Sequence, residues 1–133
     1  GPQTRSRHLA LILVDTSVWI DHLHKAEPAL VDVLARDEVV CHTLVIQELA
    51  LGSIKDRQVL LDSLVQLRGC PLATQAEILA LVDAHHLWGR GLGAVDCHIL
   101  GSLLLMPGTR LWTRDKRLRT VSGELGLPSV AWP

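Results

Sequence analysis

Short apolar runs alternate with helical stretches along the whole chain. Five runs have the length and apolar content of buried β-strands: residues 9–14, 38–41, 70–73, 111–113 and 129–132. Between them, apolar residues recur at helical spacing and predict helices over residues 17–24, 43–51, 55–67, 94–106 and 116–125. Two further helices are expected to begin at Pro28 and after Thr74. This alternation predicts an α/β fold, with helices on both faces of a mostly parallel central sheet of about five strands.

Local signals mark several helix ends. Thr43 is expected to cap one helix, which Gly52 then stops. Thr74 and Glu77 have the spacing of a capping box, in which each side chain binds the other residue's backbone N–H. Three glycines between residues 89 and 93 end the helix that follows Thr74 and allow a close backbone approach beside Asp96.

Two acidic residues follow predicted strands. Asp15 ends the apolar run at residues 11–14, and Asp115 comes after the run at residues 110–114. In parallel α/β sheets, sites form beyond the carboxyl ends of the strands, so both carboxylates are expected at one edge. Taken singly, each has a structural alternative: Asp15 suits a turn with Thr16 or Ser17, and Asp115 suits the N-cap of the last helix.

Two further acidic residues stand near the starts of predicted helices. Asp96 shares a helical face with Ile99 and Leu100, and Glu48 follows Val45 by one turn. Both are therefore expected to point inward. Carboxylates are costly to bury without compensation, and several in one site repel one another. A hard divalent cation relieves both effects, so Asp15, Glu48, Asp96 and Asp115 together predict metal-dependent chemistry.

Composition limits the kinds of partner. The chain has 133 residues, of which 48% are hydrophobic and 20% charged, and this suits one compact domain over residues 9–133. Residues 1–8 are expected to be a tail that includes a cloning remnant, because the chain does not begin with Met. With 13 basic against 14 acidic residues, a surface that is basic overall is excluded, and any contact with nucleic acid must be local. No stretch approaches the length of a membrane span.

Cations gather around Asp115. Arg114, Lys116 and Arg117 flank it, and Arg90 lies in the glycine-rich segment before Asp96. A charge run is commonly a solvated surface, yet beside an acidic cluster it also suits a phosphate-rich substrate. These four residues are the candidate contacts to the phosphate groups of such a substrate.

Other chemistries fit less well. Three scattered cysteines form no CxxC pair, which suits a reducing cytoplasm, and the histidines lack zinc-finger spacing. No Gly-x-Ser-x-Gly elbow is present, and the glycines near residue 91 follow a helix, whereas a phosphate-binding fingerprint follows a strand. A phosphatase with a strand-end Asp nucleophile is weakened because Ser17, not a second Asp, stands two residues after Asp15.

Four segments resemble the PIN-domain family, and in particular the VapC-type toxins of bacterial toxin–antitoxin pairs. They are VDTSVWID at residues 14–21, IQEL at 46–49, GLGAVDCHIL at 91–100 and LWTRDKRL at 111–118. The match in order and spacing runs from about residue 11 to 132, and the first, third and fourth segments are the specific ones. All four acidic positions are kept.

The resemblance implies a PIN-like fold and an Mg²⁺- or Mn²⁺-dependent endoribonuclease of the bacterial cytoplasm. Such a toxin would cleave RNA, with tRNA or rRNA expected, and so inhibit translation and growth. It implies Asp15 and Asp96 as principal metal ligands, Glu48 and Asp115 as completing the site partly through water, and Thr16, Ser17 or Thr113 as supports. It also implies a homodimer and a cognate VapB-type antitoxin. The alternative is a catalytically silent RNA-binding or partner-binding domain of the same fold.

Overall fold

The computed structural model of the chain describes residues 10–131, so the predicted tail at residues 1–8 and the last two residues lie outside it. In chain order, the described elements are β1 (Ile12–Val14), α1 (Thr16–His24), α2 (Pro28–Ala35), β2 (Val39–Val40), α3 (Thr43–Ala50), α4 (Arg57–Leu64), α5 (Gln75–Ala84), α6 (Ala94–Leu104), β3 (Arg110–Trp112) and α7 (Lys116–Glu124).

The sheet is parallel and centred on β1. Its order is β2-β1-β3, with Leu13 opposite both Val40 and Leu111, and Val14 opposite Trp112. A central parallel strand is covered on both faces, which is why the three residues of β1 are all apolar and all buried. The predicted α/β class and parallel pairing are confirmed.

The predicted number of strands is wrong, because the described residues form three strands. The chain makes single parallel bridges between Val40 and Arg68, two residues before the strand expected at 70–73, and between Leu111 and Ser129, at the start of the strand expected at 129–132. Pro71 lies within the first of these expected strands and lacks the N–H that would extend a ladder there, whereas Pro128 stands directly before the second. The carbonyl of Pro71 instead accepts a bond from Ser102 Oγ of α6 at 2.6 Å. Residue 132, the end of the second expected strand, lies outside the described residues.

The helices follow the predicted order with adjusted ends. The capping box is present: Thr74 Oγ1 accepts from the Glu77 amide, and Glu77 Oε1 accepts from the Thr74 amide. The N-cap of α3 is His42, not the predicted Thr43, because His42 Nδ1 accepts the Leu44 amide at 3.0 Å. Helix α4 is shorter than the predicted span of residues 55–67.

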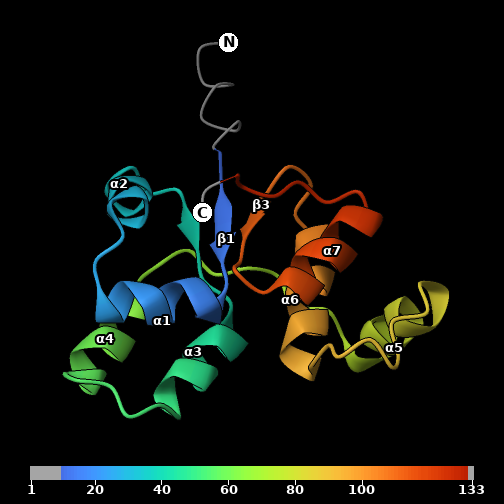
Figure 1. Cartoon of the computed structure of the whole chain (residues 1–133), viewed down its shortest axis with the longest axis horizontal. Helices are drawn as coiled ribbons and strands as arrows, with labels where there is room; N and C mark the ends of the chain where they lie inside the picture. The colour runs from blue at the N-terminus through green and yellow to red at the C-terminus, as the bar shows by residue number, and fades with distance from the viewer. Residues whose placement is uncertain (1–9, 132–133) are drawn as a thin grey trace.

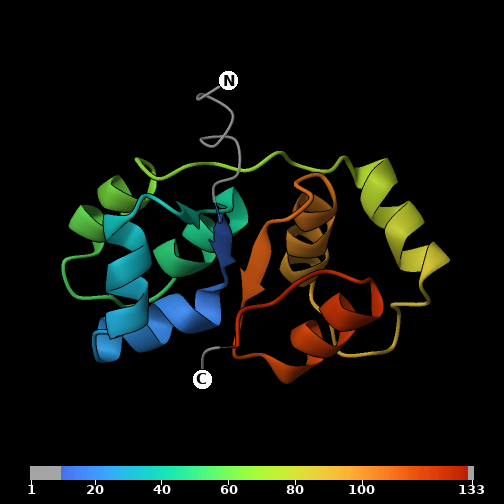
Figure 2. The same ribbon diagram turned by 90° about the horizontal axis from the view of Figure 1, so that it is seen from above.

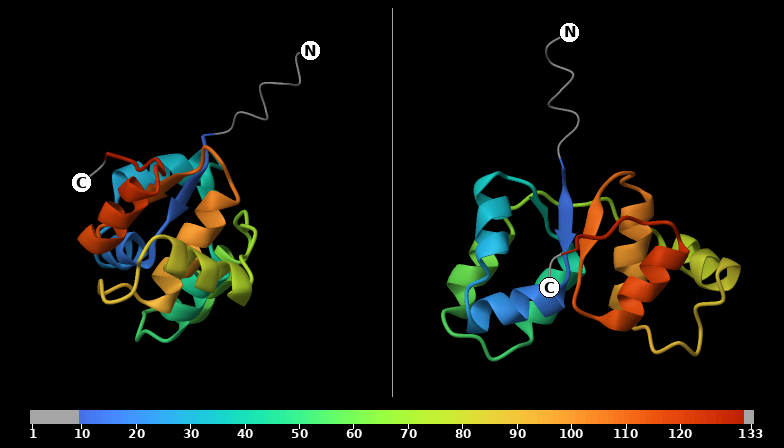
Figure 3. Two further views of the ribbon diagram at one scale, coloured as in Figure 1. Left: turned by 90° about the vertical axis from the view of Figure 1, so that its right-hand side faces the viewer. Right: turned by 45° about the horizontal axis from the view of Figure 1, so that its top comes forward.

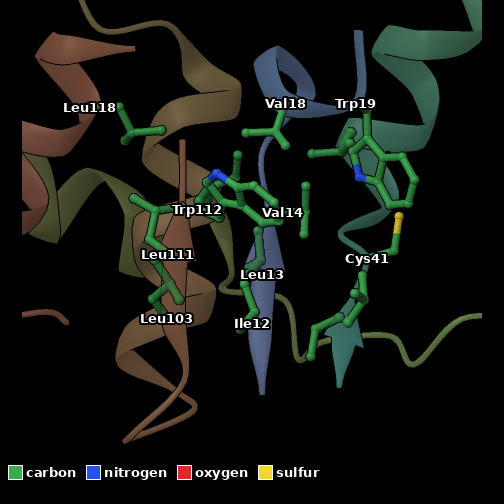
Figure 4. Close-up of a cluster of buried hydrophobic side chains, with 14 of the residues drawn as sticks. Ile12, Leu13, Val14, Val18, Trp19, Cys41, Leu103, Leu111, Trp112 and Leu118 are labelled. Carbon is green, nitrogen blue, oxygen red and sulfur yellow. The ribbon is translucent and has the colours of Figure 1, made fainter. Parts of the chain in front are cut away.

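Helices cover the sheet from both sides. α1 to α4 lie on one side of β1 and α5 to α7 on the other, as Figures 1 and 2 show. The buried core surrounds β1, with Leu111 and Trp112 of β3 on one flank and Trp19 and Cys41 on the other (Figure 4). No helix in the range 10–131 combines the length and apolar character that crossing a bilayer would require.

Strands β1 and β3 run side by side and point the same way (Figures 1 and 3). Their carboxyl ends therefore deliver residues 15 and 113 to one edge of the sheet, where α1 and α7 begin shortly afterwards. This edge carries the candidate site.

Candidate metal centre

Asp15 is the buried anchor of the site. Its amide donates to the Trp112 carbonyl at 2.9 Å, which continues the β1–β3 pairing by one residue. Its side chain is only 5% exposed, and Oδ2 accepts bonds from Ser17 Oγ at 2.8 Å and Thr113 Oγ1 at 2.7 Å. Two hydroxyl donors on one oxygen compensate the buried charge and fix the carboxylate plane. Within residues 10–131, Oδ1 accepts no hydrogen bond and keeps its lone pairs for another ligand.

Thr113 links two of the predicted acids. Its side chain is 2% exposed, and while its hydroxyl donates to Asp15 it accepts the Asp115 amide at 3.0 Å. Asp115 is the N-cap of α7, since its Oδ1 accepts the amides of Arg117 and Leu118 at 2.9 and 3.2 Å. The capping role and a site role are compatible, because the cap uses one oxygen of the carboxylate.

Asp96 is the acid whose pKa is affected by the charges of the other three acids. It lies half-buried in the first turn of α6, and its Oδ2 accepts the Gly93 amide at 2.9 Å. Burial raises the pKa of Asp96 above its usual range, the Gly93 bond opposes this, and the negative charges of Asp15, Asp115 and Glu48 raise it further. All four predicted carboxylates therefore share one electrostatic neighbourhood.

The predicted inward orientation of the Glu48 side chain is wrong. Its side chain is exposed, not inward, because α3 buries Val45 and Leu49 and leaves position 48 at the edge of that apolar stripe. The carboxylate is still tied to the site, since Oε1 accepts Thr16 Oγ1 at 2.6 Å. Glu48 also lines a groove of about 410 Å³ with apolar side chains of α1 and α3 and of residue Ile54.

The donor set suits a hard divalent cation. It consists of carboxylate oxygens supported by hydroxyls, and one oxygen of each acid is held by protein donors. Across the described residues, no three acidic, His or Cys side chains already converge as a closed ion site. The charges of Asp15, Asp115 and Glu48 all act on Asp96, and an Mg²⁺-like ion that retains several waters needs only some of the four acids directly.

A PIN-domain family model matches residues 12–124. The chain belongs to the PIN-domain family. It is also similar to Ribonuclease VapC32 of Mycobacterium tuberculosis, in strains CDC 1551 / Oshkosh and ATCC 25618 / H37Rv, at 58% identity over 117 residues. These alignments cover 88% of this chain and 94% of each relative. The predicted resemblance to VapC-type PIN domains is confirmed.

Two of the four predicted RNA-contacting cations in this PIN domain are engaged by acids. Arg90 forms two bonds with the carboxylate of Glu124, each of 2.7 Å. Arg114 Nη1 lies 2.6 Å from Asp21 Oδ2 and 2.8 Å from Glu27 Oε1. Sequence reasoning missed these acidic partners, because no local spacing signals a pair whose members are 34 or 93 positions apart.

The other two cations face a basic hollow. Lys116 and Arg117 are exposed and line a hollow of about 220 Å³ with Arg90, Thr120 and Val121. The Arg117 guanidinium crosses Gly91 so closely that a Cβ there would lie 2.8 Å from Nη1, and Gly91 also has a φ of +79°. The exposed Arg117 tip could move aside, so it is chiefly the positive φ that favours glycine at this point. The predicted close approach beside Asp96 is made by Gly93, which donates to its carboxylate.

Proposed function

We propose that this PIN domain is a metal-dependent endoribonuclease, a VapC-type toxin of the bacterial cytoplasm. The observation that carries the proposal is the buried Asp15 carboxylate, held by two hydroxyls at the strand edge, together with Asp96, on which the charges of Asp15, Asp115 and Glu48 act. The similarity to a protein named Ribonuclease VapC32 supports the same activity. Its expected RNA is a tRNA or rRNA, whose cleavage would inhibit translation and growth.

Asp15 and Asp96 would be the principal ligands of an Mg²⁺ or Mn²⁺ ion, with Glu48 and Asp115 completing its shell partly through water. Such an ion would supply an activated water and charge compensation at the scissile phosphate. Ser17 and Thr113 orient the Asp15 carboxylate, and Thr16 orients Glu48.

The protein's own groups would also place the RNA. Lys116 and Arg117, next to Asp115, would offset charge on the phosphodiester backbone, a contact that positions RNA without reading its sequence. The partners that we propose are a cognate VapB-type antitoxin, which would neutralise the toxin, and a second copy of the chain in a homodimer.

Cleavage of RNA in the presence and absence of divalent cations tests the function. The parent protein should cut RNA with Mg²⁺ or Mn²⁺ and stop in excess EDTA, and sequencing the 5′ ends of RNA fragments after induced expression should reveal a preferred cut site. Cleavage that continues in EDTA contradicts the metal role. RNA binding without cleavage under any metal condition favours the alternative, a catalytically silent binding domain.

A further inference from the structure

Arg114 joins three parts of the chain at the metal centre. It stands between Thr113 and Asp115, its side chain is 23% exposed, and its guanidinium reaches Asp21 of α1 and Glu27 at the N-cap of α2. One Nη1 group carries two hydrogens, so it can donate to both carboxylates at 2.6 and 2.8 Å. The result is a charge-assisted clamp that ties the β3–α7 connection both to α1 and to the α1–α2 connection.

The backbone of Arg114 is part of the same arrangement. Its amide donates to Ser17 Oγ at 3.1 Å, and Ser17 Oγ in turn donates to Asp15 Oδ2 at 2.8 Å. The next amide, that of Asp115, donates to Thr113 Oγ1. The turn that the guanidinium anchors thus carries one of the two hydroxyls that hold the Asp15 carboxylate, that of Thr113, and is hydrogen-bonded to the other, that of Ser17 in α1.

The partners leave Arg114 poorly suited to hold RNA. Among the described residues, the Arg114 guanidinium meets the carboxylates of Asp21 and Glu27, so these three groups together carry a net charge of about −1 and would repel phosphate. A phosphate could bind Nη1 only by displacing one of these acids. The pKa of Arg114 is raised, chiefly by its bond to Glu27 and then by that to Asp21, so the cation persists at every working pH.

We propose that Arg114 is a positioning residue of the metal centre, which fixes the turn at residues 113–115 against α1 and α2, and that it is not an RNA contact. This inference rests on the proposed function for its effect on metal and RNA, whereas its structural part can be measured without either. Arg36 provides a matched control, because it also binds two carboxylates, those of Asp32 and Glu38, but beside the amino end of β2.

The structural part is tested by hydrogen exchange in the metal-free protein. In Arg114→Ala, protection of the amides of residues 114 and 115 should fall at least ~10-fold, because charge-assisted bonds no longer oppose local opening. The double variant Asp21→Asn/Glu27→Gln, which keeps Arg114, should lose the same protection. Arg36→Ala should keep it. Unchanged protection of both amides in Arg114→Ala overturns the proposal.

The functional part of the proposal is tested by measuring Mn²⁺ affinity and the salt dependence of RNA affinity in the same variants. Mn²⁺ affinity, measured by electron paramagnetic resonance, should weaken about 10-fold in Arg114→Ala, the lower end expected when a group supporting a ligand is lost. RNA affinity at several salt concentrations, measured in an Asp96→Asn background, should keep its slope in Arg114→Ala and lose about 0.7 units in Lys116→Ala. A reduced slope in Arg114→Ala with parental Mn²⁺ affinity would overturn the proposal.

Failure of this proposal can be distinguished from misfolding of the variant and from failure of the proposed nuclease function. If Arg114→Ala does not fold, the Asp21→Asn/Glu27→Gln variant and Arg114→Lys, which retains the cation and should recover part of the protection, decide the question. If the parent neither binds Mn²⁺ nor cleaves RNA, the proposed nuclease function fails. The exchange data still decide whether Arg114 fixes the turn.

Discussion

Neutralising Asp96 separates its charge from its structural bond. In Asp96→Asn, the amide oxygen can still accept the Gly93 N–H that now bonds Oδ2 at 2.9 Å, so the start of α6 is kept. The negative charge is lost, and with it the repulsion from Asp15, Asp115 and Glu48. We therefore expect the metal-free variant to be at least as stable as the parent, and to bind a divalent ion much more weakly.

The magnitudes follow from mass action. An ion at ten times its Kd stabilises the parent by about 1.4 kcal/mol. Spread over the unfolding entropy of a domain of 133 residues, this raises the melting midpoint by about 5 °C. The variant should show little of this rise. Its metal-dependent RNA cleavage should fall at least ~100-fold, which corresponds to about 2.7 kcal/mol of lost transition-state stabilisation.

The assay measures melting midpoints with and without Mg²⁺ or Mn²⁺, and RNA cleavage rates, in the parent and two variants. Glu77→Gln is the matched control, because Glu77 holds the equivalent position in α5 and accepts the Thr74 amide at 2.8 Å, away from the site. It should keep both the metal response and the activity. Parental cleavage by Asp96→Asn, or an equal metal response in both proteins, would refute the ligand role. A metal-free variant that melts far below the parent would show that Asp96 is mainly structural.

Two further predictions concern the basic hollow and a buried histidine. Replacing Lys116 and Arg117 together by Ala should weaken RNA binding across sequences and reduce its salt slope by up to ~2 units without moving the cut site; an unchanged slope would make them ordinary surface residues. Burial, followed by the nearby charge of His98, lowers the pKa of His42 below 6.5, so the unfolded state takes up a proton first and the free energy of unfolding should fall as pH drops below about 6.5. Denaturant titrations should show this fall reduced in His42→Asn, which can still cap α3, and an identical pH profile would exclude His42 as its source.

The parts of the fold that are determined by residues close together in the sequence were predictable. The apolar run before Asp15 forms the central strand, and the Thr74–Glu77 spacing forms a true capping box. The two outer strands expected at residues 70–73 and 129–132 did not form, because an outer strand needs a neighbouring strand that extends along it. β2 has only two residues, so the segment near Pro71 finds a single bridge and gives its carbonyl to α6.

The positions of two of the acids were predictable because strand direction decides their geometry. Asp15 and Asp115 follow parallel neighbours, so their meeting at one edge is a consequence of topology. Asp96 was placed by helical phase and is indeed half-buried among the other acids. The same reasoning failed for Glu48, because phase alone does not distinguish the centre of an apolar stripe from its edge, and α3 buries Val45 and Leu49 instead.

Which cations near the site are paired with carboxylates could not be predicted from the sequence. The four predicted cations look equivalent along the chain, yet Arg90 and Arg114 bind carboxylates that are 34 and 93 positions away. What remains is a hollow on one side of Asp115, where Lys116 and Arg117 face solvent. On the other side, Arg114 is enclosed by acids. For the proposed RNA substrate, this asymmetry favours a strand that enters across the start of α7, because Lys116 and Arg117 on that flank have no ion pair with a carboxylate among the described residues.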